Sequence, residues 1–147
     1  MILENIMKLK KILISLLLSI GLIGTTSLAY ADFNDGWNAY VQEDYKGASK
    51  EWKPLAEKGD AKSQTNLGIL YYNGKGVLKD YKKAVEWLTK AAEQGEAEAQ
   101  FILGEIYIEG KGALKSFKTA KYWVQLAYEN GFNRAEGLWN EHELWKY

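Results

Sequence analysis

The sequence contains no cysteine, one proline and one histidine among its 147 residues. Without cysteine the chain can form no disulfide and cannot carry a lipid on an N-terminal cysteine, so packing alone has to stabilise its fold. The single histidine, His142, has no second histidine and no thiol with which to form a catalytic dyad or a zinc site. We therefore expect no metal, no cofactor and no enzymatic activity.

Charge of one sign does not dominate either, since 19 basic residues balance 19 acidic ones. Nucleic-acid-binding proteins present a basic stripe, and its absence argues against a nucleic-acid partner. Glycoside hydrolysis needs two carboxylates opposed across a cleft, but the clustered acidic residues fall on one predicted helix, which indicates a solvated face. These residues are Glu96, Glu98, Glu105 and Glu109.

The first 31 residues have the pattern of a secretory signal peptide. Three lysines precede an apolar run over residues 12–23, and an Ala-x-Ala cleavage site follows, ending at Ala31. The apolar run is about 12 residues long, short of the roughly 20 that span a bilayer, which favours a signal over a membrane anchor. Cleavage after Ala31 predicts a periplasmic or secreted domain of residues 32–147 without a membrane span. Either Met1 or Met7 could be the start.

The remaining chain is organised by a 36-residue repeat. Residues 61–96 align with residues 97–132 without a gap, and 16 of the 36 positions are identical. A fixed period of this length is typical of stacked helical repeats. We predict a partial repeat at 32–60, full repeats at 61–96 and 97–132, and a capping helix within 133–147.

Each repeat predicts an A helix and a B helix. Residues of N-cap type precede the B helices at 36-residue intervals, and glycines able to adopt a left-handed C-cap conformation follow them. The caps are Asp44, Asp80 and Ser116, and the glycines are Gly59, Gly95 and Gly131. We expect A helices at about 35–40, 61–73 and 134–145, and a B helix at 45–58 that Pro54 kinks. Seven helices in A/B pairs make the predicted fold an all-α solenoid of helix-turn-helix repeats.

Packing is expected to follow the repeat. Gly68 and Gly104 fall within A helices, where a glycine allows close approach of the B helix. Leu78 and Leu114 are expected to fold back from the Gly-Lys-Gly loops onto the helix pair. These loops lack the Ser or Thr that follows the lysine of a phosphate-binding P-loop, so we interpret them as turns. The aromatic residues expected at core positions are Trp52, Trp87, Trp123, Tyr71 and Tyr107.

Residues 61–95 resemble the Sel-one-like repeat (SLR) family, relatives of the tetratricopeptide repeats. The matching positions include Gln64, Leu67-Gly68, Tyr71, Asp80 and Ala84. The resemblance implies an α/α superhelix that holds other proteins together and has no catalytic residues. Family members with signal peptides are typically periplasmic, and some resemble regulators of envelope assembly or immunity proteins against secreted toxins.

We therefore predict a non-enzymatic protein–protein interaction module of the bacterial cell envelope that binds a protein or peptide. A periplasmic immunity protein that neutralises a secreted toxin is the alternative. In a tetratricopeptide-like arrangement the A helices line the concave side, where exposed aromatic residues mark interaction surfaces. The candidates on this face are Trp37, Tyr40, Lys62, Thr65, Ile69, Tyr72, Phe101, Glu105 and Ile108. Trp37 and Tyr40 could instead pack as N-terminal cap residues, and the sequence leaves that alternative open.

Overall fold

The computed structural model describes residues 33–147, which form helices joined by short loops. A helix over residues 33–41 comes first. It is followed by α2 (Tyr45–Glu57), α3 (Ala61–Asn73), α4 (Tyr81–Glu93), α5 (Ala97–Glu109), α6 (Phe117–Glu129), α7 (Arg134–Glu141) and the 3₁₀ helix η1 (Leu144–Lys146). The predicted signal peptide and its cleavage site lie outside the described residues. Over residues 33–147, no helix combines the length and apolar character that crossing a membrane requires.

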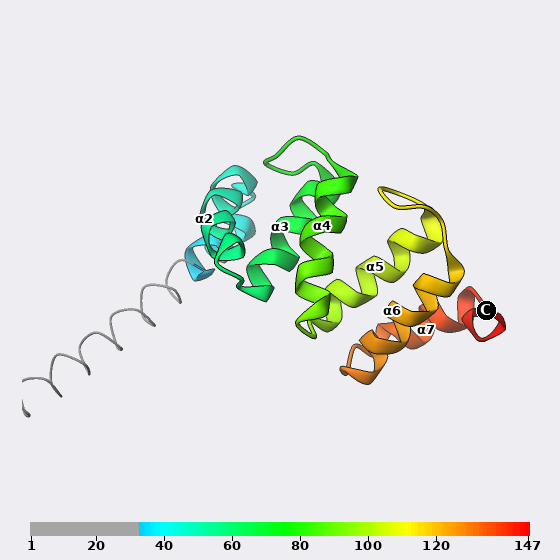
Figure 1. Ribbon diagram of the computed structural model, residues 1–147. Coiled ribbons are helices and arrows are strands. Elements are labelled where there is room, and N and C mark those ends of the chain that lie inside the picture. The colour runs from blue at the N-terminus through cyan, green and yellow to red at the C-terminus, as the bar shows by residue number, and fades with distance from the viewer. Residues whose placement is uncertain (1–32) are drawn as a thin grey trace, which may run out of the picture.

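The helices form successive hairpins that follow one another in one direction from α2 to α7 (Figure 1). In each full repeat the A helix, α3 or α5, packs along its B helix, α4 or α6. Neighbouring units join because α2 contacts α3, α4 contacts α5 and α6 contacts α7. The predicted all-α solenoid of helix-turn-helix repeats is confirmed.

The predicted cap residues begin the three B helices. The side chains of Asp44, Asp80 and Ser116 each accept a hydrogen bond from the backbone N–H group three residues further along, at 2.9, 3.0 and 3.2 Å. Each bond satisfies a backbone donor that the first turn leaves without a partner. After the helices, Gly59, Gly95 and Gly131 take positive φ values of 99°, 93° and 89°. Local sequence signals therefore set both ends of each B helix.

The cap helix is shorter than predicted. α7 ends at Glu141 instead of continuing to Trp145, because Glu143 turns into the left-handed region with φ of 48°. The turn directs Leu144 into the core formed by α5, α6 and α7, where it is fully buried. The chain therefore leaves the helix at the point where the turn allows Leu144 to be buried.

Glycine allows the two helices of each repeat to approach closely. A Cβ atom at Gly68 would lie 2.7 Å from Cγ of Leu88 and 3.3 Å from the carbonyl oxygen of Ala84. Gly104 faces Val124 in the same way one repeat later. The packing reason predicted for the two mid-helix glycines is confirmed.

Of the tryptophans expected in the core, only Trp52 is completely buried. Trp87 and Trp123 are half-buried, as are Tyr71 and Tyr107. The repeat register explains the difference, since a shift of 36 residues aligns Trp52 with the buried Leu88, whereas Trp87 lies one position earlier. There its ring lies on the flank of α4, with Nζ of Lys90 4.4 Å from the ring centroid.

Leu78 and Leu114 do not fold back onto the helices, contrary to expectation, and each is 91% exposed. The preceding residues pack instead, Val77 against the core of Trp52 and Ala113 against the core between α4 and α5. The loop backbone provides the remaining contact. A Cβ atom at Gly112, where φ is 84°, would lie 2.5 Å from the carbonyl oxygen of Tyr81. The loops are therefore seated by glycine backbone against the first turn of the preceding B helix.

Two buried glutamines connect neighbouring units. Nε2 of Gln64 donates to the carbonyl oxygen of Ala56 at 2.9 Å, and its Oε1 accepts from Nε2 of Gln94 at 2.8 Å. The side-chain amide of Gln64 therefore joins α3 to the C-terminal ends of α2 and α4. The same contacts recur 36 residues later between Gln100, Ala92 and Asn130.

Candidate protein-binding surface

The A-helix face, which we define as the surface formed by residues 33–41, α3, α5 and α7, carries three hollows. The first lies between residues 33–41, α3 and the start of α5. The second lies between α3, α5 and the start of α7, and the third between α5 and α7. Each spans successive A helices, so the stacking of the repeats creates them.

The first hollow has a volume of about 190 Å³. Trp37 lies on one side of it and remains 47% exposed. Its ring stacks on Tyr40, with centroids 5.7 Å apart. Lys62 and Glu98 bring opposite charges to the rim. This end of the face therefore offers an exposed aromatic surface beside two charged groups.

The second hollow, of about 250 Å³, combines an apolar base with charged edges. Ile69 and Phe101 contribute to the base, and the Phe101 ring contacts Phe132 with centroids 4.9 Å apart. The guanidinium of Arg134 lies 5.2 Å from the centroid of Phe101. Cations attract the face of an aromatic ring, which helps to hold this arginine at the edge. Glu105 is the opposing acidic group.

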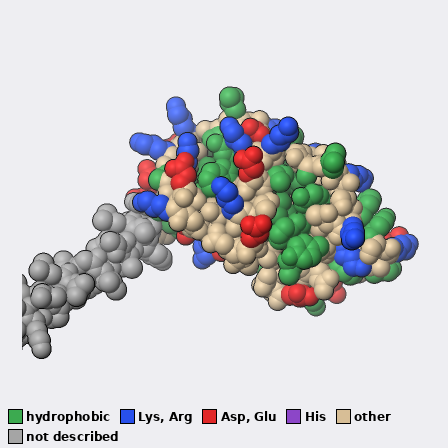
Figure 2. Space-filling model, in the orientation of Figure 1, with side chains coloured by type: hydrophobic (Ala, Val, Ile, Leu, Met, Phe, Trp, Pro, Cys, Tyr) green, Lys and Arg blue, Asp and Glu red, His purple; other side chains and the backbone are tan. Residues whose placement is uncertain are grey.

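The third hollow, of about 480 Å³, is continuous with the second. Both are lined by Phe101, Glu105 and Arg134, and the third extends along α7 to Glu141. Hydrophobic side chains are gathered over the half of the visible surface toward the C-terminus, whereas lysines and acidic side chains alternate toward α2 (Figure 2). The second and third hollows together form a groove, which we call the A-helix groove.

Tyr72 links α3 to α5 beside this groove. Its hydroxyl donates to Oε2 of Glu109 at 2.7 Å, and Nζ of Lys111 lies 3.0 Å from the same oxygen. Burial, reinforced by the hydrogen bond to Glu109, raises the pKa of Tyr72 above its usual range. The hydrogen bonds from Tyr72 and Lys111 lower the pKa of Glu109. The pair is therefore a neutral phenol bound to an ionised carboxylate.

The pKa of Glu105 shifts in the opposite direction to that of Glu109. Burial raises its pKa, and the positive charge of Arg134 only partly opposes that effect. A basic side chain placed beside this carboxyl group would favour its charged form. Glu105 also lines both hollows of the A-helix groove, whereas Glu98 and Glu141 each line only one.

The hollows bring together seven of the nine residues predicted on this face. Thr65 and Phe101 are largely buried, Thr65 at the first hollow and Phe101 in the base of the second. Two predicted residues line none of the three hollows. Tyr40 packs against Trp52, and Ile108 is buried in the core of α5, α6 and α7. The remaining five are Trp37, Lys62, Ile69, Tyr72 and Glu105.

Sequence reasoning missed Phe132 and Arg134, which complete the groove. Arg134 occupies the same repeat position as Lys62 and Glu98, so applying the register to the cap helix would have identified it. Its contact with Phe101 arises from tertiary packing, so no pattern in the local sequence indicates it. In the stretch 33–147, no group of His, Cys, Asp or Glu side chains is arranged to hold a metal ion.

Comparisons with known proteins agree with this architecture. The family model described as Sel1 repeat matches residues 61–96 and 97–132. A search of curated protein sequences gives no match.

Three solved structures are similar to the chain. A Sel1 repeat protein from Oxalobacter formigenes shares 36% identity with a TM-score of 0.63, covering 69% of this chain and 44% of that one. The protective antigen c5321 of uropathogenic Escherichia coli, described as having an SLR fold, shares 32% identity with a TM-score of 0.67. The match covers 73% of this chain and 24% of that one. Helicobacter pylori cysteine rich protein B shares 30% identity with a TM-score of 0.59. The match covers 62% of this chain and 68% of that one.

The chain thus spans less than half the length of the first two proteins. Sel1 repeat proteins are generally protein-interaction modules and non-catalytic scaffolds. The two repeat matches and the likeness to cysteine rich protein B, two thirds of which this chain covers, show that the chain belongs to the Sel1 repeat family.

Proposed function

We propose that this protein is an adaptor that holds a segment of a partner protein in the A-helix groove. The observation that carries the proposal is the groove itself, which has an apolar base formed by Ile69 and Phe101 and charged edges formed by Glu105 and Arg134. Apolar anchors surrounded by polar edges are typical of protein interfaces.

The charges define the segment that fits. An apolar side chain would pack on Ile69 and Phe101, and a neighbouring basic side chain would pair with Glu105. Arg134 at the other edge would donate hydrogen bonds to a carboxylate or a backbone carbonyl. The partner segment is therefore an apolar anchor flanked by a basic residue.

Crosslinking at single positions tests the groove. A photoreactive phenylalanine analogue placed at Ile69 should trap a partner in living cells, whereas the same analogue at Tyr122 should not. Tyr122 is an exposed aromatic residue on α6, away from the groove. Equal trapping at both positions would contradict the proposal.

Charge and apolar changes provide the matched control. Ile69→Asp combined with Arg134→Glu should abolish trapping from a second crosslinker at Asn73, at the groove rim. Tyr122→Asp combined with Lys118→Glu makes the same kinds of change on exposed α6 positions and should leave trapping intact. Circular dichroism of both purified variants checks that they remain folded.

The proposed compartment is the periplasm, on the basis of the predicted signal peptide. Fractionation should recover a chain that begins at Asp32 in the periplasmic fraction. A full-length chain in the cytoplasmic fraction would place the adaptor elsewhere. No feature of residues 33–147 favours the immunity-protein alternative over a more general adaptor.

A further inference from the structure

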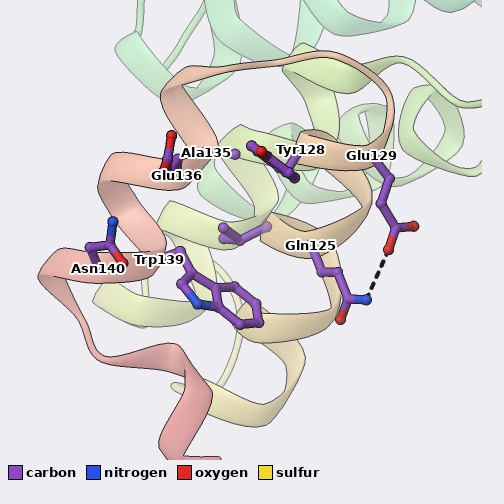
Figure 3. Close-up of a pocket in the computed structure, with 8 residues that line it drawn as sticks. Gln125, Tyr128, Glu129, Ala135, Glu136, Trp139 and Asn140 are labelled. Carbon is purple, nitrogen blue, oxygen red and sulfur yellow. Dashed lines mark hydrogen bonds between the residues drawn. The ribbon is translucent and has the colours of Figure 1, made fainter.

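A separate groove runs between α6 and α7 at the C-terminal end of the stack (Figure 3). Its volume is about 620 Å³, and it shares no lining residue with the A-helix groove. Val124 and Tyr128 come from α6, and Ala135 and Trp139 come from α7. Tyr128 is 54% exposed, whereas Ala92, at the same position one repeat earlier, is buried. We call this the end groove.

The repeat register identifies what the end groove corresponds to inside the molecule. A shift of 36 residues aligns its wall with the surface formed by α4 and α5, where six of the eight equivalent residues are buried. These buried residues are Leu88, Ala92, Ala99, Gln100, Leu103 and Gly104. The end groove is thus a further copy of a surface that the protein buries elsewhere.

A B helix covers this surface inside the molecule. Gly104 faces Val124 of α6, and Trp123 of α6 packs against the core between α4 and α5. The C-cap residue of α6, Asn130, donates from Nδ2 to Oε1 of Gln100 at 2.9 Å. One repeat earlier, α4 makes two of these contacts, from Leu88 to Gly68 and from Gln94 to Gln64. Among the described residues, no third B helix lies on the end groove.

We propose that the end groove binds an amphipathic helix of a partner protein, seated as α4 and α6 are seated in the two internal grooves. The proposal does not depend on the A-helix groove, because the two surfaces have no lining residue in common. Continuity with the internal stacking surfaces fixes the class of the occupant as a helix. Differences between the end groove and its internal copies then define the chemistry of that helix.

The first difference concerns size. Asn140 of the end groove occupies the position of Gly68 and Gly104. At those glycines, even a Cβ atom would collide with the Leu88 or Val124 side chain of the covering helix. A helix that approaches Asn140 must therefore carry a small residue, such as alanine, where α4 has Leu88.

The second difference concerns charge. The exposed Glu136 occupies the position of the buried Gln64 and Gln100. Those glutamines accept a hydrogen bond from an amide at the C-terminal end of the covering helix. Glu136 therefore places a negative charge where the covering helix ends. A lysine or arginine at that end complements both the carboxylate and the helix dipole.

The chain itself supplies a suitable probe. A peptide of residues 80–95, the sequence of α4 and its caps, is synthesised with Leu88→Ala and Gln94→Lys. An isolated helix of this length is marginal in water, so a lactam between the outward-facing Lys82 and Glu86, four residues apart, holds it helical. Binding to the isotope-labelled full chain is measured by NMR. The expected shifts are centred on Tyr128, Ala135 and Trp139.

Charge reversal provides the test that a merely misfolded variant cannot imitate. A second peptide that carries Gln94→Glu in place of lysine should bind the wild-type chain roughly fivefold more weakly, the scale of one exposed ion pair. Glu136→Lys in the protein should reverse that order. Trp139→Ala should abolish binding of the lysine peptide, whereas Trp145→Ala, which removes a half-exposed ring outside the groove, should not change it.

Three results would overturn the proposal. One is no binding of the lactam peptide at millimolar concentration. Another is a set of shifts centred on Ile69 and Arg134, which would place the helix in the A-helix groove. The third is light scattering that shows a dimer of the chain alone, lost in Trp139→Ala, because a second copy would then be the occupant.

Discussion

The close contact between the glycine loops and the preceding B helices predicts that Gly95→Ala and Gly112→Ala lower the free energy of unfolding by different amounts. Gly95 and Gly112 both have positive φ, 93° and 84°, a conformation that costs an L-residue about 1–2 kcal/mol. At Gly95 a new Cβ atom meets nothing within 4 Å. Gly95→Ala should therefore lower the free energy of unfolding by about 1–2 kcal/mol, from the backbone alone.

Gly112→Ala adds a collision to the same backbone cost. The new Cβ atom would lie 2.5 Å from the carbonyl oxygen and 2.7 Å from the carbonyl carbon of Tyr81. These atoms belong to the first turn of α4, so no side-chain rotation relieves the contact. Overpacking of this kind costs about 1–3 kcal/mol, which brings the expected loss to about 2–5 kcal/mol.

Urea unfolding followed by circular dichroism measures both free energies of unfolding. A gap of about 1 kcal/mol or more corresponds to roughly 4 °C or more in melting temperature for a domain of this size. Gly131→Ala is a second control, since its surroundings are also open. Equal losses for Gly95→Ala and Gly112→Ala would refute the seating of the loop on α4.

Three further predictions concern buried and titrating side chains. Trp52→Ala should cost about 3–5 kcal/mol in unfolding free energy because the ring is completely buried, and Trp87→Ala about half as much. Gln100→Ala should cost about 1–3 kcal/mol because it leaves a buried carbonyl at the end of α4 without a donor. Tyr72→Phe should lower the melting temperature at pH 7 but progressively less as the pH falls below about 4.5. The reason is that the pKa of Glu109 is lowered in the folded protein, so its stabilising contribution is complete above the unfolded-state pKa and is lost as the carboxylate protonates.

The helices follow from local signals that the repeat presents more than once. The N-cap side chain of Asp80 and the glycine at Gly95 mark the two ends of a B helix, and the same signals recur 36 residues later. Spacing within one helix carries less information than alignment between repeats. Trp87 was expected in the core from the apolar stripe of its helix, whereas alignment with Trp52 puts Leu88 at the buried position and leaves Trp87 on the flank of α4.

The surfaces were harder to predict because they depend on contacts between units. Leu78 was expected to pack, but glycine backbone and Val77 already fill the available space under the loop. The A-helix groove needs Arg134 from α7 over Phe101 from α5, and no periodicity within one helix encodes that pair. The sequence therefore predicted which helices form the A-helix face, but it did not predict the charged edges of the A-helix groove.

The glutamines that join neighbouring units have a mechanical consequence. Bending the stack between two hairpins would stretch the bond from Gln64 to Ala56, which is buried where replacement partners are scarce, or the partly buried bond from Gln94 to Gln64. The joint therefore resists bending through short polar bonds as well as through apolar packing, which slides more easily. The glutamines therefore stiffen each joint along the superhelix axis, and any partner that spans several hairpins meets a surface whose curvature is already fixed.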